Sequence, residues 1–138
     1  MVRIFILLLM AVAIASCDTG GTQPTTDDPT PTAESLAVAP QAAAVEAYLT
    51  AKVANDEDGI RRYLCSAMES NLDREVQSFS GVEASIDGMA CSLDEGGETV
   101  TCAGTIVAVY GGENRDFPLG TYSIVEEDGE YKWCGEAG

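Results

Sequence analysis

The sequence predicts an α+β domain in which helices precede an antiparallel sheet of about four strands. Two observations lead to this prediction. Apolar residues recur at helical spacing as far as Phe79, and from Val82 onward apolar and polar residues alternate as they do in half-buried strands. Helices in one half of the chain and strands in the other favour a sheet covered by helices on one face.

Three helical segments are expected before the sheet. One face of the first helix is apolar, and it is formed by Ala42, Val45, Tyr48, Leu49 and Val53. Asn55 and Asp56 break this helix and cap the next, in which apolar residues recur over residues 60–68. Ser66 and Glu69 have the spacing of a capping box and predict the start of a third, short helix.

Helical spacing ends at Gly81, and strands follow. They are expected over residues 82–93, 99–110, 117–125 and 131–134. Gly88 interrupts the first strand and indicates a β-bulge. Asp128-Gly129, a strong hairpin signal, connects the last two strands.

The amino terminus has the layout of a secretory signal peptide. Arg3 precedes an unbroken apolar run of eleven residues over 4–14, and small residues follow it. As a helix this run is about 16 Å long, about half of the roughly 30 Å hydrocarbon core of a bilayer. The run is therefore too short to span a membrane well, and we expect residues 1–16 to be a signal peptide that is removed.

Ile14-Ala15-Ser16-Cys17 resembles the lipobox of bacterial lipoproteins. The resemblance implies cleavage before Cys17, attachment of diacylglyceryl to its thiol, and palmitate-like acylation of the new amino terminus. Two or three acyl chains give a stable membrane anchor, so the domain is expected outside the cytoplasm and tied to the envelope membrane. The alternatives are an ordinary signal peptide in which Cys17 is merely the odd cysteine, or an uncleaved anchor.

Residues 17–40 begin with the lipidated cysteine and are expected to form a disordered tether. Beyond Cys17 this segment holds four of the five prolines and neither an aromatic nor a basic residue, so it cannot bury enough apolar surface to offset chain entropy. The folded domain is expected over residues 41–138.

The order of elements over residues 41–134 resembles the cone-shaped fold of nuclear transport factor 2-like, or cystatin-like, domains, especially those of small bacterial lipoproteins. The resemblance rests on residues 45–49 (VEAYL), 55–59 (NDEDG), 63–65 (YLC) and 127–134 (EDGEYKWC). This fold hosts isomerases, dehydratases and plain binding modules, so the resemblance does not settle the activity.

Four cysteines remain beyond Cys17, and in an exported chain they predict two disulfides. Cys91 and Cys102 are symmetrical about the turn at Gly96-Gly97, which places them opposite each other in a hairpin. Cys65 and Cys134 are then left to join a helix to the last strand. Four cysteines allow three pairings, and a four-cysteine zinc site is the rival interpretation, although no Cys-x-x-Cys spacing exists.

Composition excludes several mechanisms. The chain has no histidine, which removes imidazole general bases and histidine-dependent triads. With 23 acidic and 7 basic side chains the net charge is −16, which argues against nucleic acid as a partner. The segment 56–59 fails as a calcium loop, because aligning Gly59 with the invariant glycine puts Ala54 and Cys65 at ligand positions. No metal or other cofactor is expected.

A cone fold implies a cavity between helices and sheet, and six aromatic residues are candidates to line it or to fill it as core: Tyr48, Tyr63, Phe79, Tyr110, Tyr122 and Trp133. Catalysis there would need a buried carboxylate with a tyrosine donor, and Asp87 and Asp116 are the carboxylates flanked by apolar strand residues. Neither matches a family motif. The sequence therefore favours a non-catalytic lipoprotein domain that binds a small molecule or an envelope protein, with an isomerase- or dehydratase-like enzyme and a surface interaction module as alternatives.

Overall fold

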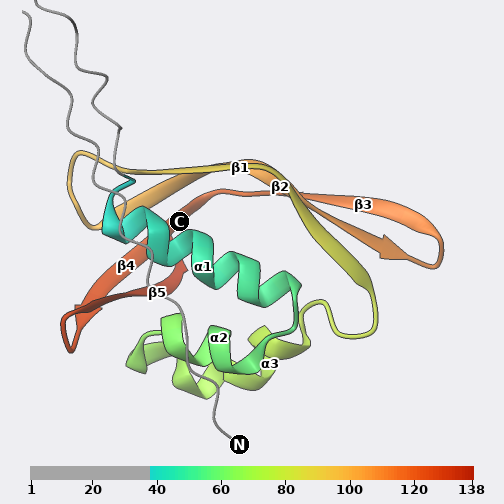
Figure 1. Cartoon of the computed structure of the whole chain (residues 1–138), viewed down its shortest axis with the longest axis horizontal. Coiled ribbons are helices and arrows are strands. Elements are labelled where there is room, and N and C mark those ends of the chain that lie inside the picture. Colours follow the sequence, from blue (N-terminus) through green and yellow to red (C-terminus); the bar gives the residue numbers. More distant parts are fainter. Residues whose placement is uncertain (1–37) are drawn as a thin grey trace, which may run out of the picture. The chain divides into compact units, whose positions relative to one another are not determined.

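The computed structural model describes residues 38–138, so the predicted signal peptide, Cys17 and most of the predicted tether lie outside the described residues. Within residues 38–138 the helices come first and the strands follow (Figure 1). The helical elements are α1 (Pro40–Val53), α2 (Glu57–Tyr63), the 3-10 helix η1 (Ser66–Asn71) and α3 (Leu72–Gln77). The strands are β1 (Glu83–Leu93), β2 (Thr99–Tyr110), β3 (Glu113–Pro118), β4 (Thr121–Glu127) and β5 (Glu130–Glu136). The predicted α+β class is confirmed, with five strands in place of about four.

Helix α1 crosses one face of the sheet and supplies much of the core (Figure 1). Its proline stands at the first helical position, where no backbone N–H is needed. Four of the five residues of the predicted apolar face are buried in a cluster with Val100 and Ile124, while Val53 is half-buried. Asn55 adopts a positive φ of 53° just after the helix and turns the chain into α2.

Helix α2 is shorter than predicted. Asp56 caps it as expected, and its carboxylate accepts the backbone N–H of Gly59 at 3.1 Å. The helix ends at Tyr63, because Leu64 is extended and forms a parallel bridge with Trp133 in β5. Pairing with β5 thus takes the chain out of its helical path.

The predicted capping box of Ser66 and Glu69 is absent. The backbone N–H and hydroxyl of Ser66 instead donate to the carboxylate of Glu127, at 3.1 Å and 2.8 Å. Residues 66–71 form a 3-10 helix, and α3 begins only at Leu72. Glu127 of β4 takes the place of Glu69 because the bridge between Leu64 and Trp133 already holds this part of the chain at the edge of the sheet.

Strand β2 is the central strand, and different partners share its length. It pairs antiparallel with β1 along one side. On its other side, residues 99–101 pair with β4 and residues 105–110 pair with β3. The sheet order is β1-β2-β4-β5, with β3 beside the outer half of β2.

The sequence prediction of one strand over 117–125 is therefore wrong. The chain breaks at Leu119 and Gly120, where two backbone hydrogen bonds of 2.9 Å join these residues to Gly104 and Cys102 of β2. Proline at position 118 cannot donate to a ladder, and the strand resumes at Thr121. Because of the break, two short strands that both run antiparallel to β2 pair with separate parts of its length.

A predicted β-bulge and a predicted turn are both confirmed. The β1 register shifts between Asp87 and Ala90, so Gly88 does mark a bulge. A Cβ on Gly104, opposite this bulge, would lie 2.8 Å from the carbonyl oxygen of Asp87, so only glycine fits there. At the last hairpin Asp128 and Gly129 both have positive φ, as a type I′ turn requires.

Residues 38–138 contain two disulfides, Cys65–Cys134 and Cys91–Cys102. They are the two pairs expected from the sequence. Cys91 and Cys102 are register partners in the β1–β2 hairpin, with Cα atoms 4.0 Å apart. Disulfides are typical of proteins in oxidising compartments outside the cytoplasm.

Candidate functional site

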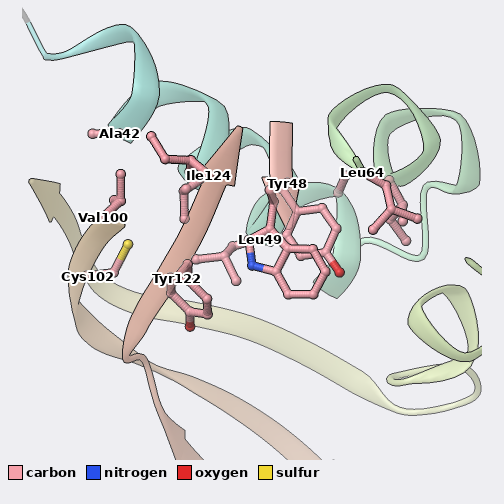
Figure 2. Packing of buried hydrophobic residues seen from close by; sticks show 12 residues of the cluster. Ala42, Tyr48, Leu49, Leu64, Val100, Cys102, Tyr122 and Ile124 are labelled. Atoms are coloured by element: carbon pink, nitrogen blue, oxygen red, sulfur yellow. The ribbon is translucent and has the colours of Figure 1, made fainter. Parts of the chain in front are cut away.

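A cavity of about 210 Å³ lies between α1 and the sheet. Helix α1 contributes three lining residues, the α3–β1 connection two, and strands β2 to β5 with the β3–β4 break the remainder. The lining residues are Tyr48, Leu49, Lys52, Ser78, Phe79, Ile106, Phe117, Pro118, Leu119, Tyr122, Trp133 and Glu136. Figure 2 shows three of them, Tyr48, Leu49 and Tyr122, side by side in the packed interior.

Four of the six aromatic residues singled out from the sequence line this cavity: Tyr48, Phe79, Tyr122 and Trp133. Tyr63 instead borders a separate surface groove with Tyr131. Tyr110 lies at the outer end of β2, where its ring meets Phe117 edge-on with centroids 6.4 Å apart. The cavity and the core are thus built from the same aromatic side chains, because these four are also buried.

Tyr48 and Trp133 form the wall between cavity and core. Their rings stack with centroids 4.2 Å apart and an interplanar angle of 8°. Trp133 is only 4 % exposed, and its indole Nε1 has no hydrogen-bond partner among the described residues. An unsatisfied buried donor costs about 1–3 kcal/mol, so this N–H is an exception in an otherwise well-paired interior.

A buried carboxylate, Glu75 of α3, lies beside the stacked pair of Tyr48 and Trp133. Its Oε2 accepts the Tyr48 hydroxyl at 2.9 Å and the Lys52 ammonium at 2.6 Å. Arg74 approaches the other oxygen at 3.4 Å from the solvent side. The Lys52 Nζ also lies 5.9 Å from the ring centroids of Tyr48 and of Trp133, within the range of a cation–π contact.

These contacts set the protonation of the cluster. Burial by itself raises the pKa of Glu75, but the hydrogen bond and charge of Lys52, helped by Tyr48 and Arg74, hold the pKa below its usual value. Burial, followed by the negative charge of Glu75, raises the pKa of Tyr48. At neutral pH the cluster is an ionised carboxylate held by an ammonium and a neutral phenol.

The Lys52–Glu75 cluster also borders a second hollow of about 360 Å³. The two hollows share Lys52, Ser78, Trp133 and Glu136. Glu136 is exposed at the end of β5, and its negative charge contributes to a raised pKa of Tyr122, after the larger effect of burial. One carboxylate, Glu136, therefore borders the cavity at its exposed edge, while the buried part of the lining is largely aromatic and aliphatic.

Lys52 and Glu75 were missed in the sequence, although a signal for both exists. Lys52 follows Tyr48 by four residues and Leu49 by three, so it lies on the apolar stripe of α1. Glu75 follows Leu72 of α3 by three residues and precedes Phe79 by four. A lone charge of each sign on two apolar stripes predicts a buried ion pair when the stripes face each other.

The carboxylates considered from the sequence do not belong to the cavity. Asp87 is exposed at the β1 bulge, and Asp116 is exposed on β3. Within residues 38–138 no three metal-ligating side chains come together. No helix in this same range combines the length and apolarity needed to cross a bilayer.

The comparisons with known proteins bear on the fold. A crystal structure from Xanthomonas campestris pv. campestris, of a proposed polyketide cyclase, matches 72 % of this chain and 90 % of its own with a TM-score of 0.50 and 16 % identity. The domain has the cone-shaped, nuclear transport factor 2-like fold. Neither a protein-family model nor a curated protein sequence matches the chain.

Proposed function

We propose that this chain is an envelope lipoprotein, anchored through acylated Cys17, whose folded domain binds a small and largely apolar molecule without chemical change. The lipobox-like residues before Cys17 support the anchor. The two disulfides support a place outside the cytoplasm. The cavity between α1 and the sheet supports the binding role.

The observation that carries the binding role is the size and lining of the cavity. A dry apolar cavity of about 150 Å³ is large enough to hold benzene. The space here is about 210 Å³ and is lined by aromatic and aliphatic side chains together with a few polar ones, which is the usual composition of a ligand site. One ring with a short substituent therefore matches its capacity.

The electrostatics favour binding over catalysis. An isomerase- or dehydratase-like enzyme on this fold needs a carboxylate that faces the ligand with a raised pKa. The buried carboxylate, Glu75, has a lowered pKa and both of its oxygens are engaged by donors. It is suited to holding α1 and α3 together around the cavity.

Native mass spectrometry of the mature chain, purified in detergent from the envelope of its own organism, tests binding. We expect a reproducible small-molecule adduct. Ile106→Phe places a larger side chain in the cavity wall and should remove the adduct, whereas Val125→Phe adds the same ring on the exposed face of β4 and should retain it. An adduct that survives Ile106→Phe would place the ligand elsewhere.

Detergent-phase partitioning tests the anchor separately. Cys17→Ala removes the thiol that would be acylated, so the protein should leave the detergent phase. Ser16→Ala keeps a small residue at the neighbouring position and should leave partitioning unchanged. A Cys17→Ala protein that stays in the detergent phase would refute the lipid anchor.

A further inference from the structure

The cavity between α1 and the sheet adjoins a hollow with a different lining. This second hollow, of about 360 Å³, is bordered by several charged side chains, and it shares Lys52, Ser78, Trp133 and Glu136 with the cavity. A ligand that fills the cavity with its ring can therefore extend a substituent into the second hollow. The charges at the second hollow determine which substituent fits there.

Two charged side chains at the second hollow are accessible and have binding capacity left. Arg74 is 70 % exposed, and its one ion pair within residues 38–138 is the 3.4 Å approach of Nη2 to Oε1 of Glu75. Because a guanidinium has five N–H donors, most of those of Arg74 remain free. Glu136 is exposed at the end of β5, and its carboxylate forms no ion pair within the same residues.

The other two charges at the second hollow neutralise each other. Lys52 Nζ lies 2.6 Å from Oε2 of Glu75, and both side chains are largely buried. Arg74 and Glu136 are therefore left as one positive and one negative group on the border of the same hollow. A ligand with a single charge would be attracted by one of them and repelled by the other, whereas a zwitterionic head group is complementary to both.

We infer that the ligand is an α-amino acid with a single aromatic ring, whose carboxylate binds Arg74 and whose ammonium group binds Glu136. This inference rests on the proposed function and specifies its ligand class. The ring occupies the apolar space beside Phe79 and Ile106, and the charged end lies in the second hollow. Most non-hydrogen atoms of such a molecule are apolar carbons, so burial of the ring supplies affinity and the two charged groups supply specificity.

Three compounds that share a phenyl ring separate the two charged contacts. L-Phenylalanine carries both charges, phenethylamine lacks the carboxylate, and phenylpropionate lacks the ammonium group. The wild-type protein should bind L-phenylalanine about fivefold more tightly than either of the other two compounds. This factor corresponds to about 1 kcal/mol, the upper end of the range for an exposed ion pair.

Isothermal titration calorimetry of the full mature chain with the three compounds tests the inference. Arg74→Gln should weaken L-phenylalanine binding about fivefold and should not weaken phenethylamine binding. Glu136→Gln should weaken L-phenylalanine and phenethylamine binding about fivefold each and should not weaken phenylpropionate binding. Arg61→Gln and Glu126→Gln are matched controls at exposed positions that border neither hollow, and they should leave all three affinities unchanged.

The outcomes separate this inference from the proposed function. Equal affinity of the wild-type protein for the three compounds, or equal weakening of L-phenylalanine and phenethylamine binding by Arg74→Gln, would overturn the amino acid assignment. Failure of L-phenylalanine to bind would overturn it as well. If Arg74→Gln does not fold, an unchanged L-phenylalanine affinity in Glu136→Gln would overturn the inference. The binding role fails by a different result, since it requires a native small-molecule adduct that Ile106→Phe removes, whatever the ligand.

Discussion

Replacing Lys52 by methionine should reverse the pH dependence of stability that Glu75 causes. In the wild-type protein the pKa of Glu75 is lower when folded than when unfolded. The unfolded chain therefore binds more protons near pH 4, and the contribution of Glu75 is present above that range and is lost as the pH falls through the folded pKa. Lys52→Met leaves a carboxylate that is 6 % exposed, with Tyr48 at 2.9 Å and the solvent-exposed Arg74 at 3.4 Å as its donors.

The magnitude follows from burial and from the remaining contacts. Removing one partner of a buried ion pair costs about 3–5 kcal/mol. The lower end applies here, because Lys52 is 20 % exposed and Arg74 remains near the carboxylate. We expect Lys52→Met to lower the free energy of unfolding by about 3 kcal/mol at pH 7.5. Burial, the largest influence on Glu75, then raises its pKa above the ordinary value of about 4.3.

Urea denaturation at pH 7.5 and pH 5.5 measures the effect, with the fluorescence of the single tryptophan as the probe. As the pH falls from 7.5 to 5.5, Glu75 takes up a proton in the folded variant before it does so in the unfolded chain. The loss of unfolding free energy caused by Lys52→Met should therefore be smaller at pH 5.5, by about 1.4 kcal/mol for each unit by which the folded pKa of Glu75 exceeds 5.5. Arg61→Met is the control, since its partner Glu57 is 56 % exposed and the pair should contribute less than about 0.5 kcal/mol at both pH values. A Lys52→Met deficit that is the same at pH 5.5 and pH 7.5 would refute the argument.

Three further predictions concern how the domain is held together. Replacing Cys65 and Cys134 by alanine should lower the free energy of unfolding by about 4 kcal/mol, and replacing Cys91 and Cys102 should lower it by about 3 kcal/mol. The first disulfide contributes more because it closes a longer loop, with a sequence separation of 69 residues against 11. Urea midpoints of the two double variants check this order. Asp56→Ala removes the α2 cap and should cost about 1 kcal/mol, measured by thermal unfolding, and a loss below about 0.3 kcal/mol would show that the cap contributes little. Gly104→Ala should lower the free energy of unfolding by more than about 2 kcal/mol, because its Cβ would meet a carbonyl oxygen at 2.8 Å. Gly96→Ala is the control and should be nearly neutral, because a Cβ there meets nothing within 4 Å. Similar losses of unfolding free energy for both variants, measured by thermal unfolding, would contradict the close approach at the bulge.

The fold was predictable because two periods of apolar residues divide the domain. Helical spacing before Gly81 and alternation after it gave the order of elements, and the turn residues gave the hairpins at Gly96-Gly97 and Asp128-Gly129. These signals are local. They depend only on which residues recur at a given spacing and on which residues tolerate a positive φ.

The errors arose where distant contacts decide local conformation. Leu64 leaves the helix because it bridges Trp133. Ser66 is capped by Glu127, 61 residues away, in place of Glu69. The β3–β4 break follows from how two short strands share β2, and no periodicity reports this.

The candidate site was predictable in its aromatic part alone. Aromatic side chains at core spacing indicate burial, and burial put four of them around one cavity. For the polar part the sequence gives a weaker signal: Lys52 and Glu75 each lie on an apolar stripe, but whether they meet depends on how α1 faces α3, which no local pattern reports. Similarly, the missing partner of Trp133 Nε1 is a property of the assembled interior.

The covalent topology of the domain gives α1 a special mechanical position. The disulfides close rings over residues 65–134 and 91–102, so every strand is enclosed within or attached to a ring, while α1 lies outside both. Only noncovalent packing holds α1 against the sheet. Tension applied from the amino-terminal side therefore acts first on α1, and peeling this helix away would remove Tyr48, Leu49 and Lys52 from the cavity wall while the cross-linked sheet stays intact.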